Sequence, residues 1–131
     1  MCPWLNAATA AGVLGGAVTT KVLPSACEFV RQDAPSEWAL RIEVQTITAL
    51  SEFAPRAAQC GSGTEMLRAI GNEAVACTSS GKKGQTAEQV VGRVRNQVFF
   101  VRVSTSSSAA EANDLRNRAR RIAEQVAGYL F

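Results

Sequence analysis

The stretch Gln97–Thr105 reads Gln-Val-Phe-Phe-Val-Arg-Val-Ser-Thr, and the fold can be predicted outward from it. Its β-branched and aromatic residues are typical of a strand. Alternation along a strand places three apolar side chains on one face and two on the other: Phe99, Val101 and Val103, and Val98 and Phe100. A strand that is apolar on both faces needs cover on both sides. We therefore expect it to lie centrally in a sheet flanked by helices.

Segments on both sides of this stretch also have strand patterns. Residues 37–46 alternate clearly between apolar and polar side chains, and a turn at residues 33–36 predicts a hairpin with Ala26–Arg31. Residues 88–95 are expected to pair with Gln97–Thr105 through a tight turn in which Asn96 takes a positive φ. Val18–Val22 and residues 74–79 are further strand candidates, residues 61–64 are expected to form a loop, and residues 66–70 fit no single pattern.

Three segments favour helices. Residues 5–16 begin at the N-cap candidate Asn6 and end at Gly15. Residues 48–59 have a helical pattern that Pro55 must start, kink or divide. The C-terminal segment opens with a capping box formed by Ser108 and Glu111. Its apolar residues then recur every three or four positions: Leu115, Ala119, Ile122, Val126 and Leu130.

The order helix, strands, helix, strands, helix, joined mainly by hairpins, predicts an α+β fold. We expect an antiparallel sheet of about five to six strands with helices packed on it. The 131 residues are expected to form one domain, residues 1–131, which is long enough to bury roughly two-thirds of its unfolded surface.

Composition excludes several function classes. The chain has no histidine, which removes the commonest general base and metal ligand. The net charge of +3 is small and the acidic residues are dispersed among the basic ones, so we expect no nucleic-acid partner. The arginines near the C-terminus, at positions 116, 118, 120 and 121, are interpreted as a solvated helix face. Apolar runs are too short to span a membrane.

The four cysteines predict two disulfides. Cys2, Cys27, Cys60 and Cys77 contain no closely spaced pair of the kind that binds zinc, so no metal or other cofactor is expected. Pairing neighbours in sequence gives Cys2–Cys27 and Cys60–Cys77; the other two connectivities stay open, and a lipid on Cys2 is an alternative to its disulfide. Disulfides indicate an oxidising compartment. Met1 leads directly into Cys2, so we expect any signal segment to have been removed already.

Several short motifs support a resemblance. They are Cys2-Pro3-Trp4-Leu5-Asn6, Cys27-Glu28-Phe29, Gly71-Asn72-Glu73-Ala74, Val94-Arg95-Asn96-Gln97-Val98 and the amphipathic C-terminal helix. Together they resemble actinobacterial lipoprotein domains of unknown function that open Cys-x-x-Leu-Thr, and more distantly PsbP-like and LpqN-like sheets backed by helices. The resemblance implies an extracytoplasmic domain of the cell envelope, periplasm or secreted fraction, lipid-anchored in many relatives, without established chemistry.

Candidate ligand contacts lie on the strands. Alternation places Arg41 on the same side as Glu43, and Arg93 and Arg102 lie on the two strands at the C-terminal hairpin. An uncovered polar sheet face would collect these four residues as ligand contacts. The simpler interpretation of Arg41 is a cross-strand ion pair.

These observations favour a non-enzymatic extracytoplasmic domain that binds a protein or a small ligand. The alternative is an envelope structural or inhibitor-type protein, and a histidine-free hydrolase or thiol enzyme is the least favoured reading. No residue is assigned a catalytic role, and the oligomeric state is left open.

Overall fold

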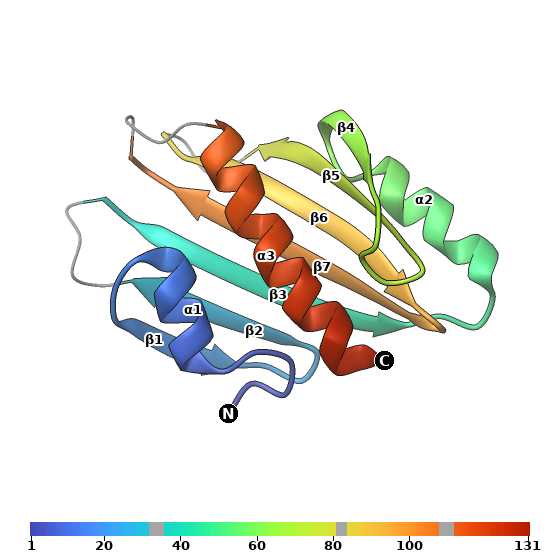
Figure 1. The fold of residues 1–131 in the computed structure, drawn as a ribbon, viewed down its shortest axis with the longest axis horizontal. Helices are drawn as coiled ribbons and strands as arrows, with labels where there is room; N and C mark the ends of the chain where they lie inside the picture. The colour runs from blue at the N-terminus through green and yellow to red at the C-terminus, as the bar shows by residue number, and fades with distance from the viewer. Residues whose placement is uncertain (32–35, 81–83, 108–111) are drawn as a thin grey trace.

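The computed structural model describes residues 1–31, 36–80, 84–107 and 112–131. Strand β7 (Gln97–Thr105) is the middle strand of a seven-stranded antiparallel sheet with the order β1-β2-β3-β7-β6-β5-β4 (Figure 1). The other strands are β1 (Val18–Val22), β2 (Ala26–Arg31), β3 (Trp38–Thr46), β4 (Ser62–Leu67), β5 (Glu73–Ser80) and β6 (Thr86–Val94). The α+β class, the antiparallel sheet and the central place of Gln97–Thr105 are confirmed. The expected number of strands, five to six, is wrong.

Strand β4 is the element that the sequence did not predict. Its first residues were expected to form a loop, yet they pair with β5, with a register shift between Ser62 and Glu65. Strand β4 is an edge strand, and all its residues except Leu67 are exposed. An exposed edge strand has no face to bury, so it carries no alternating pattern that could have revealed it.

Helices α1 (Ala7–Leu14) and α3 (Ala112–Leu130) cover one face of the sheet (Figure 1). Phe99, Val101 and Val103 are fully buried beneath them. The predicted apolar stripe of α3 faces this core: Leu115, Ala119, Ile122 and Val126 are buried, and Leu130 packs at its edge. The expected cap of α1 is confirmed, because Asn6 Oδ1 accepts from the Thr9 N–H and Gly15 takes the left-handed conformation. The capping box expected at Ser108 and Glu111 lies outside the described residues.

The opposite face is covered over only part of its area. The short helices η1 (Leu50–Glu52) and α2 (Phe53–Ala58) follow β3, and Pro55 lies in the first turn of α2, where its missing N–H costs nothing. Phe53 packs with Ile47, Val91 and Val98 in a second, smaller core. The next residue of β7 on this face, Phe100, is only partly buried. The helical cover on this face therefore ends between Val98 and Phe100 of β7.

Each disulfide ties a helical cover to its own face of the sheet. Cys2–Cys27 joins the segment before α1 to β2, on the face beneath α1 and α3. Cys60–Cys77 joins the end of α2 to β5, on the other face. Both bridges are those expected from the sequence, and all four cysteines are used.

The turn between β6 and β7 differs from the prediction. Arg95, not Asn96, takes the positive φ of 56°. The Arg95 N–H donates to Asn72 Oδ1 at 2.7 Å, and Arg93 Nη1 donates to the Arg95 carbonyl at 2.7 Å. The long-range hydrogen bond to Asn72 and the local one from Arg93 hold Arg95 in a backbone conformation that its residue type does not favour.

Two of the α3 arginines are only partly exposed and contact neighbouring elements, which differs from the sequence-based interpretation of a solvated face. Arg116 Nε donates to Glu88 Oε1 at 2.8 Å, and the Glu88 side chain on β6 is only 2% exposed. Arg118 donates to Asp114 and to the Val13 carbonyl, and its guanidinium lies 4.4 Å from the centre of the Trp38 ring. Both residues flank the apolar stripe and fasten α3 to its neighbours, a role that helical periodicity alone does not reveal.

Replacing Gly92 by alanine should destabilise the protein by about 1–3 kcal/mol, because an added methyl group would overlap the ring of the buried Phe99, its partner across the β6–β7 ladder. Gly128→Ala is the matched control: it lies in α3, its added methyl meets nothing within 4 Å, and alanine should stabilise the helix by up to about 1 kcal/mol. Urea unfolding of both variants measures the difference. Equal stabilities would contradict this packing.

Arg116→Ala should cost about 3–5 kcal/mol, because it leaves the buried Glu88 carboxylate without its ion-pair partner. The double variant Glu88→Leu/Arg116→Leu removes both charges and should recover most of that loss. Arg121→Ala, at an exposed position of the same helix, should change stability by no more than about 0.5 kcal/mol. Denaturant titrations of the three variants compare them directly; a double variant as unstable as Arg116→Ala would refute the ion-pair explanation.

Candidate functional site

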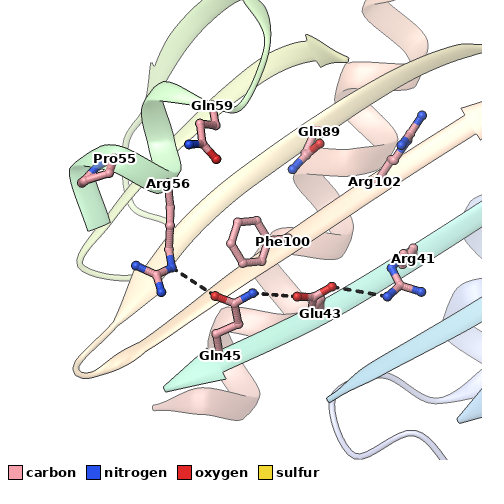
Figure 2. Close-up of a pocket in the computed structure, with 9 residues that line it drawn as sticks. All are labelled: Arg41, Glu43, Gln45, Pro55, Arg56, Gln59, Gln89, Phe100 and Arg102. Atoms are coloured by element: carbon pink, nitrogen blue, oxygen red, sulfur yellow. Dashed lines mark hydrogen bonds and ion pairs between the residues drawn. The ribbon is translucent and has the colours of Figure 1, made fainter. Parts of the chain in front are cut away.

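A polar cavity of about 620 Å³ opens on the sheet face opposite α3, beside α2 (Figure 2). We call it the groove. Strands β3, β6 and β7 supply one part of its lining, and α2 with its C-cap residue Gln59 supplies the other: Arg41, Glu43, Gln45, Gln89, Phe100, Arg102, Pro55, Arg56 and Gln59. The groove begins where α2 no longer covers the sheet. It therefore exists because helices cover only part of this face.

Strand β3 contributes a row of three polar side chains. Arg41, Glu43 and Gln45 are two residues apart and therefore share one face. Arg41 Nη2 donates to Glu43 Oε1 at 3.3 Å, and Gln45 Nε2 donates to Glu43 Oε2 at 2.7 Å. Gln45 Oε1 in turn accepts from Arg56 Nε at 3.0 Å, which links the row to α2 (Figure 2). These hydrogen bonds connect the side chains into a network that holds the polar end of each one in place.

The cross-strand ion pair expected at Arg41 is confirmed. Its partner is Glu28 on β2, directly opposite in the register, with 2.7 Å between Arg41 Nη1 and Glu28 Oε2. Both side chains are more than one-third exposed, so the pair adds little to stability, on the order of 0–1 kcal/mol.

Strands β7 and β6 complete the floor of the groove. Arg102 lies opposite Arg41 across the β3–β7 ladder and opposite Gln89 across the β7–β6 ladder. Phe100, two residues along β7, lies opposite Glu43. Two arginines at directly paired positions repel each other, which opposes sheet formation. The ion pairs of Arg41 with Glu28 and Glu43 offset this repulsion.

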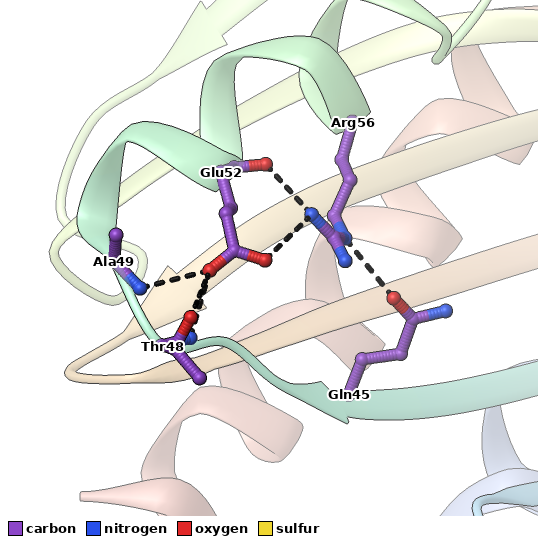
Figure 3. A network of polar contacts seen from close by, with 5 residues as sticks. All are labelled: Gln45, Thr48, Ala49, Glu52 and Arg56. Carbon is purple, nitrogen blue, oxygen red and sulfur yellow. Dashed lines mark hydrogen bonds and ion pairs between the residues drawn. The ribbon is translucent and has the colours of Figure 1, made fainter.

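Helix α2 is held against the sheet by a network around Glu52 (Figure 3). Glu52 Oε2 accepts from the backbone N–H groups of Ala49 and Thr48, each at 2.8 Å, and from Thr48 Oγ1 at 2.9 Å. The Glu52 carbonyl accepts from Arg56 Nη1 at 2.9 Å. The hydrogen bonds from Ala49 and Thr48, with a smaller contribution from Arg56, lower the pKa of Glu52. The same network turns the Arg56 side chain toward the groove.

A smaller hollow of about 290 Å³ adjoins the groove on the same face. The two share Arg41 and Arg102, and the smaller one extends toward Glu28 and Glu37. Gln85 Nε2 donates to Glu37 Oε1 at 2.9 Å at its far end. Polar side chains therefore continue along the face from α2 to β2.

The structure brings together three of the four residues proposed from the sequence. Arg41, Glu43 and Arg102 line the groove, whereas Arg93 does not. Arg93 lies near the β6–β7 turn, where its Nε donates to Glu73 Oε2 at 2.7 Å across the β5–β6 ladder. Arg93 is too close to the β6–β7 hairpin to line the part of the sheet face that α2 leaves uncovered.

Sequence reasoning missed six lining residues: Gln45, Pro55, Arg56, Gln59, Gln89 and Phe100. Gln45 could have been found, since it shares the alternation of Arg41 and Glu43. Phe100 was assigned to the correct face but interpreted as covered core. Arg56 and Gln59 gave no signal, because their place depends on how α2 docks.

The described residues contain no group of three or more His, Cys, Asp or Glu that could hold a metal ion. Within the same residues no helix has both the length and the apolar character needed to cross a membrane. No known family model matches the sequence, and comparison with curated proteins finds no relative. The geometry of the groove is therefore the basis for assigning a function.

Glu52→Gln should lower the melting temperature at pH 7. The difference in melting temperature between the variant and the parent protein should become smaller as the pH falls below 4.5. The folded state lowers the pKa of Glu52 from that ordinary value, so its charge stabilises the fold above pH 4.5 and ceases to do so once the pH falls through the folded-state pKa. Thermal unfolding monitored by circular dichroism from pH 7 to pH 3 follows this difference. Ser51→Ala, an exposed neighbour without a carboxyl group, is the control; a difference for Glu52→Gln that stays constant over this range would contradict the role of the charge.

Proposed function

We propose that this chain is a non-enzymatic binding domain of an extracytoplasmic compartment and that it holds a small ligand in the groove. The observation that carries the proposal is the open sheet face: a cavity of about 620 Å³ with the partly buried Phe100 at its floor and fixed polar groups around it. Small-molecule sites typically measure about 300–1,000 Å³ and combine apolar surface with a few well-placed polar groups.

The chemistry of the side chains supports binding over catalysis. The chain has no histidine, and all four cysteines are in disulfides, so neither a histidine base nor a thiolate nucleophile is present. Among the described residues that line the groove, Glu43 is the one carboxylate. Both of its oxygens accept hydrogen bonds from Arg41 and Gln45. A carboxylate engaged in this way serves as a structural acceptor.

Two observations support the extracytoplasmic location. The two disulfides are compatible with an oxidising compartment, since such bonds persist outside the reducing cytoplasm. The motifs around Cys2 and Cys27 resemble those of envelope lipoprotein domains. A protein partner, the other candidate, is better matched by a flat apolar patch than by a hollow polar face.

A fragment screen by NMR tests the proposal. Binding of fragments to the ¹⁵N-labelled protein should shift amide signals of β3, β6, β7 and α2, and leave those of α1 and the outer side of α3 unchanged. Phe100→Ala removes the floor of the groove from a partly buried position and should weaken these fragments at least about tenfold, on the order of 1.4 kcal/mol. Asn117→Ala, exposed on α3, should not. Fragments that map to the α1 and α3 face, or a screen without any binder, would overturn the proposal.

A further inference from the structure

The hydrogen-bonding groups of the groove are unequally occupied. Three of its acceptor oxygens are engaged within the protein: each Glu43 oxygen receives a hydrogen bond, and Gln45 Oε1 receives one from Arg56. Its donors are more numerous, because three arginines line it and each guanidinium has five N–H groups. Arg41 uses two of its five, toward Glu28 and Glu43, within the described residues. A bound molecule with acceptors of its own can therefore pair with the remaining N–H groups of Arg41.

Positive side chains outnumber negative ones in the lining, and Glu28 and Glu52 pair with two of them, Arg41 and Arg56. The larger cavity is lined by three arginines and one glutamate. Arg41 and Arg102 lie at paired positions of β3 and β7, where backbones are about 5 Å apart, so one acidic group can contact both guanidinium groups. Arginine binds carboxylate and phosphate through paired, charge-assisted hydrogen bonds.

Phe100 adds an apolar contact at a defined spacing. It lies on the same face as Arg102 and two residues before it, which corresponds to about 7 Å along the strand. The two glutamines at positions 59 and 89 also line the cavity and present amide groups. A ligand with an acidic end and a planar or apolar body can therefore contact the arginine pair and the ring together.

On the basis of the proposed function, we infer that the groove binds a small organic anion. Its carboxylate or phosphate lies between Arg41 and Arg102, and its planar or apolar body lies on Phe100. A cationic ligand is disfavoured, because the lining holds three guanidinium groups and one carboxylate, and that carboxylate already accepts from Arg41 and Gln45. A neutral polyol is also disfavoured, since it carries no charge to pair with the guanidinium groups.

Isothermal titration with four probes tests the inference: 3-phenylpropionate, its neutral amide 3-phenylpropionamide, phenyl phosphate and inorganic phosphate. The acids should bind at least about tenfold more tightly than the amide, the scale expected for hydrogen bonds to a charged group. Comparing the two aromatic acids distinguishes carboxylate from phosphate as the preferred group. Inorganic phosphate should bind more weakly than phenyl phosphate, because it lacks a body to contact Phe100. Added salt should weaken the acids and leave the amide nearly unchanged.

Variants then locate the site. Arg102→Gln should weaken 3-phenylpropionate about tenfold and bring its affinity close to that of the amide, while Phe100→Ala should weaken both. Arg121→Gln removes the same charge from an exposed position of α3 and should change neither. Unchanged melting temperatures and NMR spectra confirm that the variants fold. Chemical-shift mapping of 3-phenylpropionate on the parent protein gives the same information without any variant.

The outcomes separate this inference from the proposed function. If the amide binds in the groove as tightly as the acid, the preference for an anion is wrong and a binding groove remains. If acids bind elsewhere on the protein, the inference is overturned. If neither these probes nor the screened fragments bind in the groove, both proposals fail.

Discussion

The structure depends on one constraint: β7 is apolar on both faces, and the two faces are covered to different extents. Phe99 and its neighbours on one face are sealed by α3 and α1. On the other face α2 reaches Val98 but leaves Phe100 partly open. An α-helix of six residues is too short to cover a seven-stranded sheet. The groove therefore exists because the helix on this face is too short to cover all of it.

The disulfides compensate for the shortness of the covering helices. Helices of six and eight residues are unstable alone and are held by tertiary contacts. Cys2–Cys27 anchors the segment that leads into α1, and Cys60–Cys77 anchors the end of α2. In the chain-entropy model a bridge that closes a loop of this size contributes about 3 kcal/mol. Because α2 forms a wall of the groove, the second bridge links the stability of the fold to the shape of the site.

The polar face is held in place by hydrogen bonds within the protein. Hydrogen bonds run from Glu28 through Arg41, Glu43 and Gln45 to Arg56, across three elements of the chain. Such a network fixes side chains that would otherwise lose conformational freedom on binding, and this loss is a main cost of association. It also engages both oxygens of Glu43 and Oε1 of Gln45 within the protein. The same contacts thus stabilise the open face and define the chemistry that it offers.

Local periodicity was enough to determine the strand Gln97–Thr105, the stripe of α3 and the shared face of Arg41 and Glu43, because these depend on neighbours two to four residues apart. The two disulfides agree with the pairing of cysteines that are neighbours in sequence, but the sequence left the other two connectivities open. Only the tertiary structure decided that β3 lies beside β7, which brings Arg41 opposite Arg102, and that α2 brings Arg56 to the same cavity. It also revealed β4 and separated Arg93 from the site. The reason is physical: alternation indicates which face a side chain occupies, but the strand or helix that it meets there is selected by packing between segments far apart in the sequence.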